Sequence, residues 1–549
     1  MRVASSRKLL AGLLAVGLFG CTSGDPKTVK FWVDKINNDH TEREKKADAA
    51  HLQEVAKTAK DPGGATLVAS LLKNQPGDVV AAAASALGDM GDKSVVPELV
   101  DAVDISRGSG ADHATEEANH ANKAIARTLG QLGDKGATPG LLKLLKSKDN
   151  YTVIEAINAL GDLKDPAGVK SLSDIATDTS IEPFVNKKAI MALGQIADPG
   201  ALPAVHQMLY EERKGMSFFA ESSFAIYEIG KPSTDMLIGD LKGSDPKFAG
   251  WAKDHGILRG AVLAKTAQML GDLNDSRAES ELLKLLSYKD EDAQLQYATR
   301  MQAADALGRM RSTKAVKPLT EMLGDEEVAA RNTYMRALRF IGDKSAVAAV
   351  AKKMDAPKES IGYREEAYKT VALMGDAAEA KAYDSAFNGE EKRLTGECKE
   401  AEIGDADCQA QIKEVTARLK QYKAALATNC ATGSVSCWTA KLQDPNPFVR
   451  TRAALELGHS GKADALSALF DAIQKPLDGA DNDAVQNQDE ARFAAIMAVH
   501  WLLDSGAKAS DAAGMADKLE KQVEAEKSKT ATMRSAEDVK RLAVRLRRA

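Results

Sequence analysis

Apolar and polar positions recur along most of this chain in units of similar length. From Gly88 to Gly375 successive copies are 31 to 42 residues apart. In each clear copy, small or apolar residues stand one, two, four and five positions before a glycine. That spacing lies on one face of a helix, so each stretch is predicted to be a helix that the glycine ends in a left-handed conformation. The ten copies end at Gly88, Gly130, Gly161, Gly194, Gly230, Gly271, Gly308, Gly342, Gly375 and Gly458.

Another apolar stripe lies earlier in each unit. The four leucines within residues 141–145 recur within residues 282–286, and a turn that often contains aspartate comes before the stripe. Each unit therefore predicts a first helix and a second helix joined by short turns. Self-similarity at this period is typical of a stacked solenoid, and the small residues are expected to let adjacent second helices approach closely.

One unit shows the pattern most fully, and it points to a known family. The segment Asp444-Pro-Asn-Pro-Phe-Val-Arg450-Thr-Arg-Ala-Ala-Leu-Glu-Leu-Gly458 resembles HEAT repeats, especially the short bacterial HEAT-like repeats also described in phycobilisome lyases. The resemblance covers about residues 61–380 and 442–507. It implies an all-α fold: a right-handed α-solenoid of HEAT-like (armadillo-type) helical hairpin repeats, interrupted by a Cys-containing helical insert.

The N-terminus has the features of an export signal. Arg2, Arg7 and Lys8 precede an apolar run, Leu9 to Phe19, which is too short to span a bilayer as a helix. Leu18-Phe19-Gly20-Cys21 resembles the lipobox of bacterial lipoproteins, although phenylalanine replaces the usual small residue. The resemblance implies a lipid on Cys21 and a place in the bacterial cell envelope, at the outer membrane facing the periplasm; an ordinary cleaved signal is the alternative.

The same patterns divide the chain into six parts. We expect a lipoprotein signal peptide at 1–20, a tether with N-terminal capping helices at 21–60, a HEAT-like array at 61–380, a Cys-containing helical insert at 381–440, C-terminal HEAT-like repeats at 441–510 and a capping helix or tail at 511–549.

Four cysteines lie within the insert, namely Cys398, Cys408, Cys430 and Cys437. An even number of cysteines in an exported chain favours disulfides. A local pairing, Cys398–Cys408 with Cys430–Cys437, and a nested pairing, Cys398–Cys437 with Cys408–Cys430, both remain open. The spacings do not match the two-residue knuckles of common zinc motifs.

Charge and motif content argue against several classes of function. The formal net charge is -5, which disfavours a general nucleic-acid binder. The eight histidines include no His-Glu pair, so a di-iron hydroxylase built on HEAT-like repeats is disfavoured, and no phosphate loop or nucleophile motif is present. We therefore expect no catalytic residue, no metal site and no cofactor.

The remaining expectation is a binding surface for a protein or peptide partner. The position three residues before each glycine points away from the packed stripe, and it carries chemically varied side chains. We expect a non-enzymatic envelope scaffold that uses this position; the alternatives are an assembly subunit that docks through the Cys-rich insert and, more distantly, a cofactor- or pigment-handling enzyme of the HEAT-like lyase type. The candidate partner-binding residues are Arg127, Asn158, Tyr227, Gln268, Asp305 and Arg339.

Overall fold

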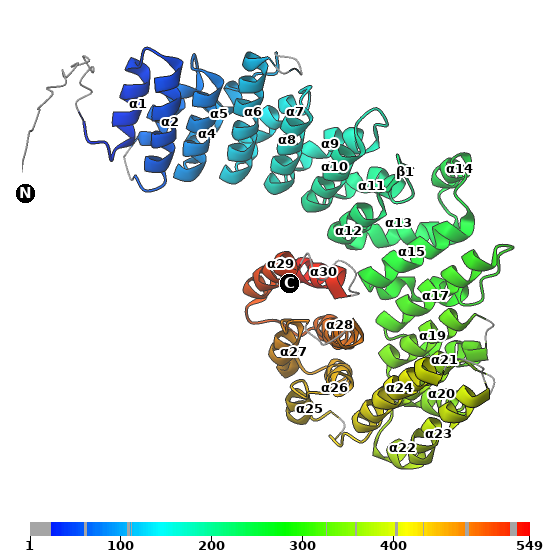
Figure 1. The fold of residues 1–549 in the computed structure, drawn as a ribbon. Coiled ribbons are helices and arrows are strands. Elements are labelled where there is room, and N and C mark those ends of the chain that lie inside the picture. Colours follow the sequence, from blue (N-terminus) through cyan, green and yellow to red (C-terminus); the bar gives the residue numbers. More distant parts are fainter. Residues whose placement is uncertain are drawn as a thin grey trace, which may run out of the picture. The chain divides into compact units, whose positions relative to one another are not determined.

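The computed structural model describes residues 24–59, 63–106, 110, 112–324, 327–356, 359–400, 405–431, 433–477, 482–526 and 535–548. These residues are mainly helical (Figure 1), so the predicted all-α fold of stacked helical hairpins is confirmed. A short antiparallel ribbon joins strands β1 (Glu212–Arg213) and β2 (Met216–Ser217). No helix in this described part has the length and apolar character needed to cross a membrane. The predicted signal peptide and Cys21 lie outside the described residues.

The chain forms two compact units, Met1–Ala225 and Ile226–Ala549. In the first unit the long second helices of neighbouring repeats pack side by side. Its helices are α1 (Val29–Asn38), α2 (Glu42–Ala56), α3 (Gly64–Ala69), α4 (Gly77–Met90), α5 (Val96–Asp101), α6 (His113–Leu132), α7 (Thr138–Leu144), α8 (Asn150–Leu163), α9 (Val169–Thr177), α10 (Pro183–Ile196) and α11 (Leu202–Met208), and the boundary falls within α12 (Phe219–Ile229).

The second unit continues the array and then adds an insert and a C-terminal segment. The array comprises α13 (Lys231–Lys242), α14 (Pro246–Asp254), α15 (Arg259–Leu273), α16 (Glu279–Leu285), α17 (Ala293–Arg309), α18 (Val316–Glu321), α19 (Val328–Ile341), α20 (Val347–Ala351) and α21 (Ile361–Met374). The rest comprises α22 (Ala377–Ala382), α23 (Asp384–Glu400), α24 (Asp405–Leu426), α25 (Val435–Lys441), α26 (Pro447–His459), α27 (Leu466–Ile473), α28 (Asn482–Asp504), α29 (Ala512–Glu526) and α30 (Ser535–Arg548).

Aspartate opens the first helix of most repeats by capping a 3-10 turn. The side chain of Asp134, for example, accepts a hydrogen bond of 2.8 Å from the amide of Gly136. This contact satisfies one of the amides that a helix start leaves without an internal partner. The predicted aspartate turns are therefore caps, and the same arrangement occurs at Asp92, Asp165, Asp198, Asp275 and Asp343.

The prediction that the repeat glycine ends the second helix is wrong for most copies. α8 runs past Gly161 and ends at Leu163, where Lys164 takes the left-handed conformation with φ 50°. α6 likewise runs past Gly130 and ends before Gly133, whose φ is 63°. The residue that ends the helix therefore lies three positions beyond the repeat glycine.

The repeat glycine instead permits close packing between neighbouring second helices. A Cβ atom placed on Gly130 would lie 3.0 Å from Cα of Ala159, and one on Gly271 would lie 2.9 Å from Cα of Ala306. Ordinary carbon contacts need about 3.5–4.0 Å. The absence of a side chain, rather than backbone freedom, is what the repeat requires here, and the predicted close approach of second helices is confirmed.

The insert contains a disulfide between Cys430 and Cys437, whose Cα atoms are 5.8 Å apart. This bond belongs to the local pairing and is incompatible with the nested one. Cys408, at the start of α24, is also disulfide-bonded. Cys398 lies in α23, and its side chain is outside the described residues.

Candidate partner-binding surface

The six predicted partner-binding residues lie in different environments. Arg127 and Asn158 are exposed and Gln268 and Asp305 are partly exposed, but Tyr227 and Arg339 are buried. The prediction of a solvent-facing side chain is therefore wrong for Tyr227 and Arg339.

A shift of register explains both errors. Ala337 packs against Gly308 as Ala306 packs against Gly271, so Arg339 stands where the repeat glycine stands in α17, two residues after the packing alanine. Gly342 is the helix-ending residue, with φ 74°. The sequence does indicate the correct register, because Ala337-Leu338-Arg339 matches the Ala-Leu-Gly ending of other repeats with arginine in place of the glycine.

The same shift applies to α12. Gly230 has φ 81° and directly follows the end of the helix, as Ala197 with φ 57° follows the end of α10. Ala225-Ile226-Tyr227 therefore corresponds to Ala192-Leu193-Gly194. Sequence reasoning missed two residues at the position that Arg127 and Asn158 occupy in their own repeats, namely Met191 and Phe224. Arg336 and Lys369 hold the same position, and the sequence offers them as candidates only by a count of six residues before Gly342 and Gly375.

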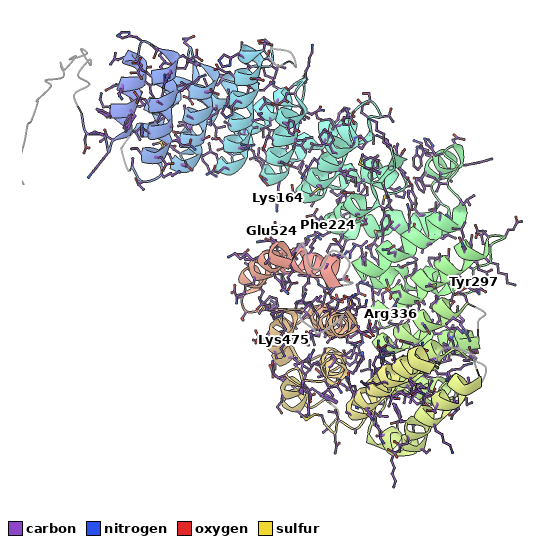
Figure 2. All side chains as sticks on the ribbon, viewed as in Figure 1. Lys164, Phe224, Tyr297, Arg336, Lys475 and Glu524 are labelled. Carbon is purple, nitrogen blue, oxygen red and sulfur yellow. A yellow bond between two sulfur atoms is a disulfide. The ribbon has the colours of Figure 1, made fainter. Side chains whose placement is uncertain are left out.

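We define the second-helix ridge by the positions three, six, seven and ten residues before the repeat-glycine position in α6, α8, α10, α12, α15, α17, α19 and α21. Positions three, six and ten share one face of each helix because they are separated by three, four or seven residues, and position seven lies four residues from position three and three from position ten. Phe224 and Arg336, labelled in Figure 2, both belong to this ridge.

In the first unit the ridge is open to solvent and partly apolar. Tyr151 of α8 is 68% exposed, and Phe184 and Met191 of α10 are 44% and 42% exposed. Neighbouring helices are also linked along the ridge by an ion pair between Arg127 and Glu155.

In the second unit the chain's own C-terminal helices contact the ridge at Lys369 and cover its flank. Lys369 of α21 pairs with Glu490 of α28. Phe493 of α28 lies against Phe340, with 5.6 Å between ring centroids. Figure 1 shows α28 and α30 next to the array helices of this unit, so the predicted capping tail is folded along the array.

Buried ion pairs secure this cover. The guanidinium of Arg309 lies 2.9 Å from Asp305, 3.4 Å from Asp272 and 3.1 Å from Asp538 of α30. Arg541 of α30 lies 3.1 Å from Asp272. Burial raises the pKa of Asp272, and the two arginines oppose that rise. Removal of either the arginines or the carboxylates would leave buried charge without a partner and would destabilise the cluster.

Tyr227 and Arg339 also take part in this internal interface. The carbonyl of Tyr227 accepts a hydrogen bond of 3.2 Å from Arg548, and burial raises the pKa of the phenol to about 12. Arg339 pairs with Glu366 and lies 3.4 Å from Glu490. Both residues therefore hold the second unit together in this structure.

Two histidines lie at the same interface, His459 half-buried and His500 buried. His459 stacks on Trp501 with 5.2 Å between ring centroids, and its Nε2 is 2.9 Å from the carbonyl oxygen of Phe340. Burial, followed by nearby Arg311, lowers the pKa of His459 to about 4. Burial and Arg545 lower the pKa of His500 well below its usual value.

One cluster in the described residues has metal-ligand chemistry. Glu42, His113 and Glu117 place ligand atoms within 4.8 Å of one another. The ammonium of Lys46 already lies 3.0 Å from Glu42 and 2.5 Å from Glu117. Because this cation neutralises the carboxylates and two of the three ligands are exposed, we do not assign a metal to the cluster.

A polar cavity of about 890 Å³ lies beside the insert in the second unit. Its lining includes Glu414 and Arg418 of α24 together with Lys475 and Asp483. Arg418 pairs with Glu365 and lies 3.1 Å from Asp483, so internal ion pairs occupy part of the lining.

Comparison with known protein families identifies the repeats. The family of HEAT repeats matches residues 112–182, 155–216, 259–333 and 295–369, and the PBS lyase HEAT-like repeat matches residues 79–104. The chain is thus built on HEAT repeats over these segments, as the sequence pattern predicted. Comparison with curated proteins gave no match.

Several solved structures show general similarity to the chain. The karyopherin Kap121p bound to Ste12p is 12% identical, with a TM-score of 0.44, and the match covers 95% of this chain and 67% of that protein. Human deoxyhypusine hydroxylase is 18% identical over 52% of this chain and 97% of the enzyme, with a TM-score of 0.21. The CpcE–CpcF complex of phycocyanin lyase from Nostoc is 16% identical over 60% and 99%, with a TM-score of 0.24. These values carry no conclusion about activity or partners.

Proposed function

We propose that the protein is a non-enzymatic scaffold that binds protein or peptide partners through the second-helix ridge of the first unit. The observation that carries this proposal is the contrast between the two units. In the second unit α28 pairs with the ridge at Lys369 and packs on its flank, whereas Tyr151, Phe184 and Met191 leave apolar side chains exposed on the first. Exposed apolar side chains at equivalent positions of adjacent helices favour a binding surface over an ordinary solvated face.

Photocrosslinking in cells tests the proposal directly. A photoreactive phenylalanine analogue would replace Phe184 or Met191 on the ridge and, as matched exposed controls off the ridge, Leu67 or Leu258. We expect discrete crosslinked proteins from the two ridge positions and not from the controls. Equal crosslinking from all four positions, or none from the ridge, would contradict the proposal.

We further propose that the scaffold is held at the bacterial cell envelope by a lipid on Cys21, most simply at the outer membrane facing the periplasm. The lipobox-like residues before Cys21 support this proposal. Several acyl chains give stable anchoring because each buried methylene contributes about 0.8 kcal/mol. Cys21→Ser should move the protein from the membrane fraction to the soluble fraction, whereas Thr22→Ala should not. A Cys21→Ser variant that stays with the membrane would overturn the anchor.

The cavity beside the insert favours one second candidate, an assembly subunit that docks through the Cys-rich insert. Its lining combines Arg418, Lys475 and Asp483, so a polar segment of a neighbouring protein fits it best. Crosslinks confined to residues 390–440 would favour this candidate, and crosslinks on the ridge of the first unit would favour the scaffold.

A further inference from the structure

Three exposed apolar side chains form a patch of defined geometry on the first unit. Tyr151 and Phe184 stand at the same ridge position on α8 and α10, which pack against each other. Met191 follows Phe184 by seven residues, which is about 10 Å or two helical turns. Since packed helices lie about 8–10 Å apart, the three side chains mark the corners of a patch that one helix of a partner can cover.

The charges around this patch favour a carboxylate-bearing occupant. On α6, α8, α10 and α12 the ridge positions hold four cations (Lys123, Arg127, Lys187 and Lys188) and two carboxylates (Glu155 and Glu221), in a chain whose net charge is -5. Arg127 pairs with Glu155, and Lys187 lies 2.9 Å from Glu221. Lys123 and Lys188 form no ion pair with any residue that the structure describes. Two ridge ammonium groups therefore remain for a partner's carboxylates.

The second unit shows how a helix satisfies the same kind of surface. Glu490 of α28 pairs with Lys369 at a ridge position. Three residues later, Phe493 lies against Phe340 and is 5.2 Å from the guanidinium of Arg309. One face of α28 thus supplies a carboxylate for a ridge cation of α21 and an aromatic ring for Phe340 on the flank of the ridge in α19.

We propose that the ridge of α8 and α10 binds an acidic amphipathic helix of a partner protein, whose apolar face covers Tyr151, Phe184 and Met191 and whose carboxylates pair with Lys123 and Lys188. This proposal rests on the proposed scaffold function and names the chemistry of its partner. Such a helix carries glutamate or aspartate three or four residues from its apolar anchors, as in the helix-in-groove mode of peptide recognition.

A pair of designed peptides tests the charge preference. The probe is a fluorescein-labelled helix of about 18 residues, five turns, with leucine and phenylalanine on one face and glutamate three positions before each; its match has lysine in place of every glutamate. Full-length protein is titrated against each peptide by fluorescence anisotropy. We expect the glutamate peptide to bind about tenfold or more tightly than the lysine peptide, and to weaken as salt rises.

Three variants locate the binding site. Tyr151→Ala/Phe184→Ala/Met191→Ala should weaken the glutamate peptide about tenfold or more, because truncating central apolar anchors removes most of the binding energy. Lys123→Glu/Lys188→Glu should reverse the preference toward the lysine peptide. Leu258→Ala, at an exposed apolar residue off the ridge, should leave both affinities unchanged. Circular dichroism spectra that match the unaltered protein would show that the variants are folded.

Several results would overturn the proposal. Equal affinity for the two peptides, or unchanged binding by the triple variant, would exclude an acidic helix on this patch. Self-association of the protein that the triple variant abolishes would identify the occupant as a second copy of the chain. If ridge photocrosslinks persist while the protein binds the two peptides equally, the acidic-helix assignment fails and the scaffold function stands. If the ridge gives no photocrosslinks and the protein shows no peptide preference, the acidic-helix assignment and the scaffold function both fail.

Discussion

Gly308 offers a direct test of how neighbouring repeats pack. A Cβ atom at this position would lie 2.8 Å from Cα and 3.1 Å from Cβ of Ala337. Because ordinary carbon contacts need about 3.5–4.0 Å, Gly308→Ala would force α17 and α19 apart by about 0.5–1 Å. Overpacking of this kind costs about 1–3 kcal/mol, and the better helix propensity of alanine returns up to about 1 kcal/mol. We expect a net loss of about 1–2 kcal/mol.

The matched control is Gly250, which lies exposed within α14 and has no atom within 4 Å of the place that a Cβ atom would take. Gly250→Ala should stabilise α14 by about 0.5–1 kcal/mol, so the two substitutions have opposite signs. Urea unfolding followed by circular dichroism would compare the midpoints. Because repeat arrays can depart from two-state unfolding, amide hydrogen exchange in α17 and α19 would provide a local measure. A Gly308→Ala protein as stable as the unaltered chain would refute the role assigned to the repeat glycine.

Four further substitutions, one of them a control, test the internal interface and the insert. Arg309→Ala should lower the free energy of unfolding by about 3–5 kcal/mol, because it leaves buried Asp272 and Asp538 with Arg541 in place of two paired arginines; Lys170→Ala, which breaks a pair with Asp174 that is exposed on both sides, should cost less than about 1 kcal/mol. The folded-state pKa of His459, about 4 against the usual 6.5, means that the unfolded chain binds the proton more tightly. Stability should therefore be full above pH 6.5 and fall by about 3 kcal/mol as the pH drops from 6.5 to 4, and His459→Gln should flatten that part of the unfolding profile. Cys437→Ser opens a disulfide that spans seven residues and should cost about 2.5 kcal/mol in denaturant, whereas an unchanged midpoint would show that the bond contributes nothing.

The candidate site was only partly predictable because its positions depend on register. Where Ala-Leu-Gly ends the packed stripe, as at Gly161, counting back three residues reaches the exposed Asn158. Where an arginine or a tyrosine replaces that glycine, the next glycine along the chain is the helix-ending one. The same count then reaches Arg339, which is buried. The correct register predicts that Met191 and Phe184 occupy ridge positions, but it does not predict that their side chains are exposed.

The sequence by itself determined the local and nearest-neighbour structure of this protein. The spacing of small residues before each glycine fixes a helical face, and the aspartate before each first helix fixes a cap, because both act within a few residues or between adjacent repeats. Only the tertiary structure decided where the C-terminal helices contact the ridge and its flank. Arg309 and Asp538 are 229 positions apart, and no periodicity links them, because contacts between an array and a segment folded along it depend on shape and charge in space rather than on any repeat.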